Sequence, residues 1–99
     1  MNFEIAPKST EVQLNWDDAR LYCFSLNIDG KIGWRLPTKE ELNRIYESQN
    51  DFEKSWYWSG TDNSGNYAWS QGIGNGIQGN RNKNYSYYYV RAIRDLKDD

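Results

Sequence analysis

The stretch Gly33-Trp34-Arg35-Leu36-Pro37-Thr38-Lys39-Glu40-Glu41-Leu42 decides the local fold, because it contains the start of a helix. Pro37 fixes its own φ angle and favours an extended conformation at Leu36. Thr38 and Glu41 match a capping box, in which each side chain accepts a hydrogen bond from the other residue's backbone amide. The pattern predicts a helix over residues 39–48. Its buried positions are predicted to be Leu42, Ile45 and Tyr46.

A second helix is predicted upstream, beginning at Asn15. Asn is a favoured N-cap residue, and Asp17 and Asp18 in the first turn suit the positive end of the helix dipole. Helical spacing places one set of side chains on the buried face, namely Trp16, Ala19, Cys23 and Leu26, with Tyr22 beside them.

Strands are predicted on both sides of these helices. Residues 3–5 and 11–14 alternate enough to form short strands, although such short runs are ambiguous. From Trp56 onward helical periodicity is lost, and aromatic or β-branched runs at residues 57–59, 68–70, 76–77 and 87–93 are separated by Gly and Asn. The prediction is an α+β fold in which two short helices precede a twisted antiparallel sheet with long loops. The 99 residues are expected to form one domain.

Composition limits the classes of function. Five Trp and eight Tyr indicate a core built largely from aromatic rings. A net charge of −2 argues against general nucleic-acid binding, which favours a basic domain. Residues 1–7 lack the apolar region of a signal peptide, and no apolar run is long enough to insert into a membrane. As written, the chain is expected in the cytoplasm, and the lone Cys23 allows no internal disulfide.

Three sequence blocks also resemble one known family. Besides the Trp34–Leu42 block, these are Tyr57-Trp58-Ser59-Gly60-Thr61 and Val90-Arg91-Ala92-Ile93-Arg94. In this order, over about residues 14–95, they resemble the bacterial and phage domain of unknown function found at the C-terminus of the Legionella collagen-like adhesin. That family is similar to the formylglycine-generating-enzyme and C-type-lectin-like folds, so the resemblance implies a C-type-lectin-like arrangement.

The resemblance also assigns roles to individual residues. It implies structural positions at Trp34, Arg35, Arg91 and Arg94, with the arginines tying the final strand to loops more readily than contacting a ligand. Relatives often carry a second cysteine where this chain has Ala92.

Catalysis and cofactor chemistry are not expected. The chain has no histidine, which removes the commonest general base and the commonest metal ligand. Cys23, on the apolar face of its helix, is interpreted as a buried small hydrophobe. Asp62, Asn63 and Asn66 offer oxygens that suit Ca²⁺, but a turn that needs Asp, Asn and Gly is the favoured interpretation. The chain is therefore predicted to be no enzyme and to hold no cofactor and no metal.

Residues 74–89 are the most unusual segment. They are rich in Asn, Tyr, Ser and Gly, a composition typical of antibody-like recognition surfaces. We expect charge-assisted contacts from loop cations to an anionic ligand, with aromatic stacking beside them. The ligand-binding residues are predicted to be Arg81, Lys83, Tyr85, Tyr88, Trp58, Trp69, Asn80 and Asn82. The alternative, that the segment is ordinary hairpin turn and strand, stays open.

The predicted function is a non-enzymatic binding domain for a glycan, a host protein surface or a small anionic ligand, as the resemblance to adhesin and phage receptor-binding modules implies. The alternative is a free-standing intracellular phage or mobile-element protein that sequesters an anionic small molecule or inhibits a host protein. A third reading is a diversified variable protein. A phage origin would make the chain virion-associated, and homo-oligomerisation is left open.

Overall fold

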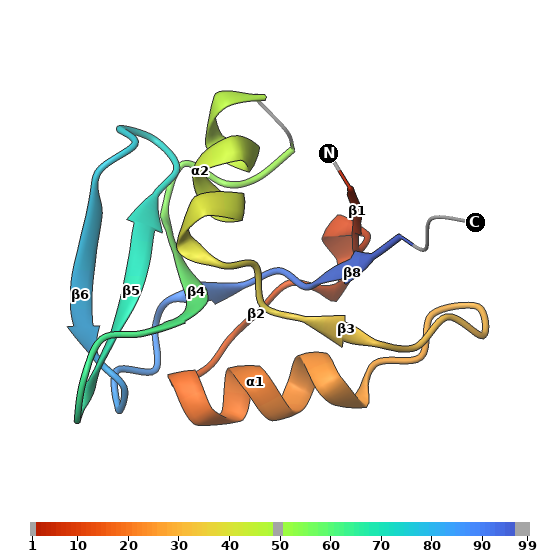
Figure 1. Cartoon of the computed structure of the whole chain (residues 1–99), viewed down its shortest axis with the longest axis horizontal. Helices are drawn as coiled ribbons and strands as arrows, with labels where there is room; N and C mark the ends of the chain where they lie inside the picture. The colour runs from red at the N-terminus through yellow and green to blue at the C-terminus, as the bar shows by residue number, and fades with distance from the viewer. Residues whose placement is uncertain (1, 49–50, 97–99) are drawn as a thin grey trace.

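The computed structural model describes residues 2–48 and 51–96, and within them it contains two α-helices, one short 3-10 helix and eight strands (Figure 1). The helices are α1 (Trp16–Ser25), α2 (Lys39–Glu47) and the 3-10 helix η1 (Lys8–Thr10). In chain order the strands are β1 (Phe3–Ile5), β2 (Val12–Gln13), β3 (Trp34–Arg35), β4 (Trp56–Asp62), β5 (Tyr67–Gly72), β6 (Gln78–Asn82), β7 (Tyr89–Val90) and β8 (Ile93–Asp95).

Both helices begin where their caps predict. The Asn15 side chain accepts from the Asp18 amide at 2.9 Å. Thr38 accepts from the Glu41 amide at 3.1 Å, and Glu41 accepts from the Thr38 amide at 2.8 Å, which completes the capping box. The α2 helix ends at Glu47, with Ser48 as its C-cap. No helix follows within residues 57–93, all of which the structure describes, so the predicted α+β class is confirmed. The C-type-lectin-like arrangement stays a prediction.

The strands form two sheets instead of the one antiparallel sheet expected. The five-stranded sheet has the order β2-β7-β4-β5-β6, and the three-stranded sheet has the order β1-β8-β3. All pairs are antiparallel except β4 and β7, which pair in parallel at Tyr57 and Tyr89. The expected single strand over residues 87–93 is broken, because Arg91 and Ala92 leave the ladder and carry the chain from one sheet to the other.

The expected strand at residues 76–77 is also wrong. Gly76 has a φ of +77° and belongs to the turn before β6, and the Ile77 side chain is exposed. The strand is instead Gln78–Asn82, which pairs with β5 along its whole length. Pairing with an existing strand decides the conformation here, since Gly and Asn have low intrinsic strand propensity.

The core consists of two clusters that lie on opposite faces of the five-stranded sheet. Successive residues of β4 divide between them, with Trp58 in the cluster beneath α1 and Tyr57 in the cluster beneath α2. The α1 cluster includes Trp16, Ala19 and Cys23. The α2 cluster includes Leu42 and Ile45. These five predicted positions are at most 4% exposed and are confirmed, whereas Tyr46 and Leu26 are only partly buried, and Leu26 is the C-cap of α1.

Two of the sequence blocks contact each other at a bulge in β4. The register between β4 and β5 shifts between Trp58 and Asp62. Within this bulge the Gly60 amide donates to the Pro37 carbonyl at 2.7 Å, and the Thr61 hydroxyl accepts from the Lys39 amide at 2.9 Å. A Cβ atom at Gly60 would lie 3.3 Å from the Cβ of Leu36, so the close approach favours glycine. The bulge thus anchors the start of α2.

Among the described residues, no helix is both long and apolar enough to cross a membrane.

Candidate functional site

Strand β6 lies at an edge of the five-stranded sheet and carries the centre of the predicted binding surface. Asn80, Arg81 and Asn82 are all exposed there. Beside the strand lies a hollow of about 520 Å³, which we call the β6 hollow. It is lined by Tyr67, Asn80, Arg81, Asn82, Asn84 and Tyr85. Sequence reasoning therefore named four of these six residues.

The β6 hollow wraps around the edge of the sheet, because alternate side chains of β6 point to opposite faces. Arg81 is paired across the strands with Ala68, which is buried in the α1 cluster. Asn80 and Asn82 are on the other face, paired with Trp69 and Tyr67. Only at an edge strand do both faces border the same hollow.

Arg81 has an unusual environment. Its guanidinium carbon lies 4.1 Å from the centre of the Tyr85 ring and 5.8 Å from that of Tyr88. None of the ion pairs found among the described residues includes Arg81. The stacked ring supports one face of the guanidinium and leaves its N–H edges free for a bidentate contact.

Lys83 does not have the exposed position expected for it. Its Nζ atom lies 2.9 Å from Asp62, donates to the Gly65 carbonyl at 2.8 Å and lies 4.6 Å from the centre of the Trp16 ring. Its side chain is only 16% exposed. The Lys83 hydrogen bonds hold the pKa of the Asp62 carboxyl below its usual value. Lys83 thus joins the β4–β5 turn to the start of α1, and its charge is already engaged.

The other predicted aromatic residues, Trp58, Trp69 and Tyr88, do not line the β6 hollow. Trp58 is completely buried, and its indole donates to the Leu14 carbonyl at 2.9 Å. Trp69 pairs with Asn80 across the β5–β6 ladder but is not part of the lining, and Lys39 lies 4.1 Å from its ring centre. Tyr88 packs against the rings of Trp58 and Tyr85, and its ring centre lies 5.8 Å from the Arg81 guanidinium carbon.

Sequence reasoning missed Tyr67 and Asn84 as lining residues. Tyr67 is half exposed and opposes Asn82 across the β5–β6 pair. Recognising residues 78–82 as the strand that pairs with residues 67–71 would have found Tyr67. Asn84 lies two residues after the end of β6, and neither its side chain nor that of Asn80 makes a hydrogen bond within the described part of the chain.

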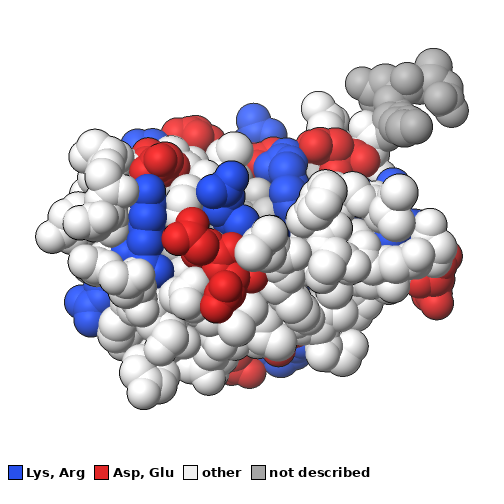
Figure 2. Space-filling view, turned by 90° about the horizontal axis from the view of Figure 1, so that it is seen from below, with Lys and Arg blue, Asp and Glu red and all other residues white. Residues whose placement is uncertain are grey.

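The side of the molecule that carries α1 has no patch of a single charge. Figure 2 shows Lys and Arg atoms beside Asp and Glu atoms over much of this face, next to a broad area without charged atoms. This mixture agrees with the net charge of −2 and gives no support for nucleic-acid binding over this face.

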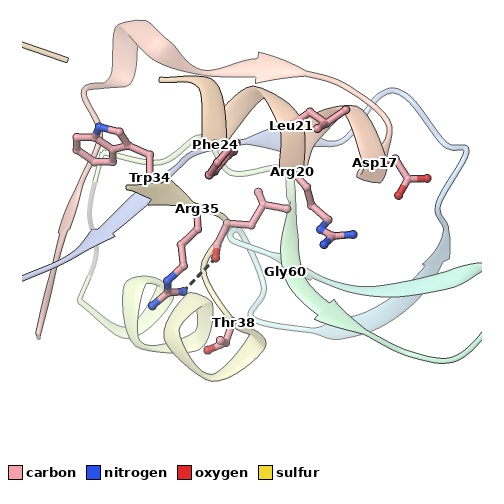
Figure 3. Close-up of a pocket in the computed structure, with 9 residues that line it drawn as sticks. Asp17, Arg20, Leu21, Phe24, Trp34, Arg35, Thr38 and Gly60 are labelled. Atoms are coloured by element: carbon pink, nitrogen blue, oxygen red, sulfur yellow. Dashed lines mark hydrogen bonds between the residues drawn. The ribbon is translucent and has the colours of Figure 1, made fainter. Parts of the chain in front are cut away.

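A second hollow, of about 610 Å³, lies between α1 and the segment that leads into α2 (Figure 3). We call it the α1 hollow. Its lining consists of Asp17, Arg20, Leu21, Phe24, Trp34, Arg35, Leu36, Thr38 and Gly60. None of the predicted ligand-binding residues lies in it, whereas two of the family positions do.

The family positions in the first block are held by internal contacts. Arg35 binds Glu41 through two hydrogen bonds of 2.8 and 2.9 Å and binds Asp95 through two of 3.1 and 2.7 Å. These hydrogen bonds hold the pKa of both carboxyls below their usual values. Trp34 is buried and donates to the Lys31 carbonyl. Arg35 therefore connects the start of α2 to the end of β8.

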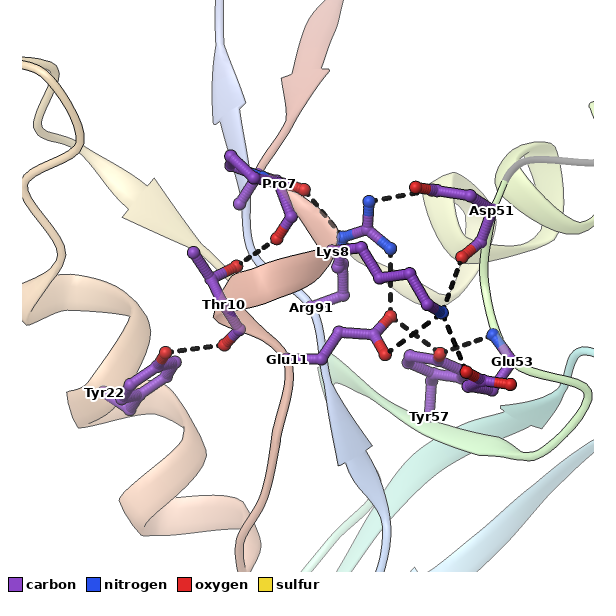
Figure 4. A network of polar contacts seen from close by, with 10 residues as sticks. Pro7, Lys8, Thr10, Glu11, Tyr22, Asp51, Glu53, Tyr57 and Arg91 are labelled. Carbon is purple, nitrogen blue, oxygen red and sulfur yellow. Dashed lines mark hydrogen bonds and ion pairs between the residues drawn. The ribbon is translucent and has the colours of Figure 1, made fainter.

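The two arginines of the last block are also paired. Arg94 donates to Glu4 at 2.8 Å, across the β1–β8 pair. Arg91 is 4% exposed and donates to the Ala6 carbonyl at 2.6 Å, to Glu11 at 2.9 Å and to Asp51 at 2.8 Å (Figure 4). Arg91 thereby joins three segments that are distant in the sequence.

The Arg91 contacts belong to a larger polar network. The Tyr57 hydroxyl donates to Glu11 at 2.8 Å and accepts from the Glu53 amide at 2.8 Å. Burial, and then the hydrogen bond to Glu11, raise the pKa of Tyr57, so its hydroxyl remains a donor. Lys8 lies 2.9 Å from Glu53 and donates to the Asp51 carbonyl. We interpret this network as structural, because no buried side-chain polar atom among the described residues lacks a hydrogen-bond partner.

Within residues 2–48 and 51–96, no three His, Cys, Asp or Glu side chains come close enough to hold a metal ion. The sequence 62–66, considered for Ca²⁺, forms the β4–β5 turn, in which the Tyr67 amide donates to the Ser64 carbonyl and Ser64 has a φ of 58°.

The fold and its surface define a small α+β domain with aromatic clusters on both faces of a mixed sheet. The chain belongs to the Lcl C-terminal domain family, whose model matches residues 4–94. This membership covers all three sequence blocks and suggests an adhesin-like domain. No curated protein matches the chain.

Proposed function

We propose that this domain is a non-enzymatic binding module that holds an anionic or sugar-bearing ligand in the β6 hollow. The observation that carries the proposal is Arg81, an exposed guanidinium stacked on Tyr85 with no carboxylate partner among the described ion pairs. Arginine presented in this way binds carboxylate, sulfate or phosphate groups through paired hydrogen bonds.

The rest of the lining suits a hydroxyl-rich ligand. Asn80 and Asn84 offer amide groups, each with donors and an acceptor, and Tyr67 and Tyr85 offer ring faces beside them. The volume of about 520 Å³ falls within the usual range of about 300–1,000 Å³ for ligand pockets. Membership of the Lcl C-terminal domain family supports an adhesin-like role for such a site.

A non-enzymatic role is supported by the chemistry of the chain. It has no histidine, and its one thiol, Cys23, is fully buried. Burial raises the pKa of Cys23 to about 12, so the thiolate that nucleophilic catalysis requires does not form near neutral pH.

The test uses an array of sulfated, uronic-acid and neutral oligosaccharides, followed by titration calorimetry with the tightest binder. Arg81→Ala should weaken binding by about tenfold or more, which corresponds to about 1.4 kcal/mol, and binding should weaken as salt is added. Arg44→Ala is the matched control, because Arg44 is an exposed arginine on α2 outside the hollow. No binding to any array member, or equal loss in both variants, would refute the proposal.

A further inference from the structure

The outer face of α1 carries a stripe of exposed side chains, two of them large and apolar, that no part of residues 2–48 and 51–96 covers. Asp17, Arg20, Leu21 and Phe24 follow the three- and four-residue spacing of one helix face. Leu21 is 66% exposed and Phe24 is 78% exposed, although α1 already buries its opposite face. Two large apolar side chains one turn apart on an exposed helix face mark a contact surface more often than scattered single ones do.

The α1 hollow lies directly against this stripe. Its opposite wall is formed by Trp34, Leu36 and Gly60, the first two of which are nearly fully buried. Gly60 contributes only backbone atoms to this wall, and a Cβ atom at Gly60 would contact Leu36. The hollow is thus an apolar groove of about 610 Å³ between a helix and an extended segment, within the size range of small-molecule sites.

Four of the nine residues that line the α1 hollow are polar or charged, and two of these four are arginines. The guanidinium of Arg35 is taken up by Glu41 and Asp95. Arg20 lies 4.7 Å from the centre of the Trp16 ring and takes part in none of the ion pairs among the described residues. Figure 3 shows the Arg20 side chain reaching toward Gly60, with Phe24 toward the other end of the groove and Asp17 beyond Arg20.

We propose that the α1 hollow binds a small amphipathic anion, with its apolar body against Leu21, Phe24 and Leu36 and its carboxylate or sulfonate on Arg20. Burial of apolar ligand surface against these side chains favours binding. The Arg20 guanidinium favours a ligand that carries a negative charge at one end. Asp17 lies on the far side of Arg20 and works against anion binding. This site is separate from the β6 hollow, with which it shares no lining residue.

The test uses two fluorescent probes that differ mainly in charge, the sulfonate 1-anilinonaphthalene-8-sulfonate and the neutral N-phenyl-1-naphthylamine. The folded protein should bind the sulfonate with saturation, and the part of this binding that Arg20→Ala removes should fit one site, with an unchanged near-ultraviolet circular dichroism spectrum. Arg20→Ala should weaken sulfonate binding by about tenfold and should leave the neutral probe nearly unaffected. Phe24→Ala should weaken both probes, and Asp17→Asn should leave sulfonate binding equal or tighter.

Arg44→Ala is the matched control, since it removes one exposed positive charge that lies on α2 outside both hollows. Equal sulfonate binding by wild type, Arg20→Ala and Phe24→Ala would overturn the proposal, as would fluorescence that never saturates. Concentration-dependent dimerisation that Phe24→Ala abolishes would also overturn it, because the groove would then be covered by a second copy of the chain. Circular dichroism of each variant checks the fold, which substitutions at these exposed positions should preserve.

Discussion

Replacement of Arg91 by alanine should lower the free energy of unfolding by about 3–5 kcal/mol, the usual effect of removing one partner of a buried ion pair. Arg91 is 4% exposed, and its three hydrogen-bond acceptors belong to Ala6, Glu11 and Asp51. Ala6 and Glu11 lie before β2, and Asp51 lies between α2 and β4. The Arg91 side chain, near the C-terminal end of the sequence, therefore connects its own segment to both of these.

The three contacts are expected to contribute unequally. The Glu11 side chain is 9% exposed, and without Arg91 its nearest remaining cation is Lys8 at 3.8 Å. The Ala6 carbonyl would also lose its charged donor inside the protein. Asp51 is 64% exposed, so water would replace the guanidinium there at a cost of about 1 kcal/mol or less. Most of the loss should therefore come from Glu11 and Ala6.

Urea denaturation followed by tryptophan fluorescence measures these differences, with Arg91→Ala, Arg91→Lys, Asp51→Asn and the exposed control Arg44→Ala compared. Arg91→Lys keeps the charge but loses the planar fork, so its loss should fall between those of Arg91→Ala and Arg44→Ala. The control should change stability by no more than about 0.5 kcal/mol. A loss below about 1 kcal/mol for Arg91→Ala, or an equal loss for Asp51→Asn, would refute the reasoning.

Further predictions concern core packing, the loss of stability at low pH, the reactivity of the cysteine thiol and the turn before β6. Leu42→Ala should cost about 2–5 kcal/mol in urea denaturation because Leu42 is fully buried, and a loss below about 0.5 kcal/mol would contradict this. The folded pKa of Glu41 lies below its ordinary value of 4.5, so the stabilisation by its arginine partner is complete above pH 4.5 and is lost as the pH falls through the folded pKa. Glu41→Gln should therefore reduce the stability difference between about pH 7 and about pH 3, and an unchanged difference would exclude this linkage. Cys23, whose pKa is raised to about 12, should react with a thiol reagent only as fast as the chain unfolds, and rapid labelling of the folded protein would show it to be accessible. Gly76→Ala should destabilise by about 1–3 kcal/mol, because φ is +77° and a Cβ atom would come within 2.6 Å of the Tyr46 ring. Gly79→Ala, with open space around its Cα, is the control, and equal effects of the two substitutions would contradict the turn geometry.

The helices could be predicted from the sequence because their causes are local. The N-caps at Asn15 and Thr38 act within one turn, and the spacing of Trp16, Cys23, Leu42 and Ile45 directly encodes the buried faces. The lack of further helices followed from the loss of this spacing after residue 56. None of these inferences required knowledge of which segments meet in space.

The candidate site could be predicted only in part, because its geometry depends on strand pairing. Arg81, Tyr85 and the neighbouring asparagines were found from composition, but Tyr67 joins them only through its register with Asn82. The assignment of Trp58 to the same surface failed because β4 is an inner strand whose two faces are both covered, so Trp58 and its neighbour Tyr57 are each buried in a core cluster. Lys83 was expected in an exposed loop, yet an ion pair with Asp62 and the nearby Trp16 ring hold it partly buried.

The recognisable sequence blocks and the proposed binding sites have different tasks in this structure. The blocks contact one another: Gly60 bonds to Pro37 in the bulge, and Trp34 and Arg35 pair with β8 at Arg94 and Ile93. Their arginines are already engaged with carboxylates of the same chain.

Charge that is still available for a partner lies mainly outside the blocks. Arg20 and Arg81 both lie over aromatic rings without a carboxylate partner among the described ion pairs, and both border a hollow. Because both side chains are exposed and neither takes part in the described ion pairs, each is expected to be replaceable at little cost in stability. Under the two proposals above, binding specificity is expected to follow the residues at these two positions, while the three blocks maintain the scaffold.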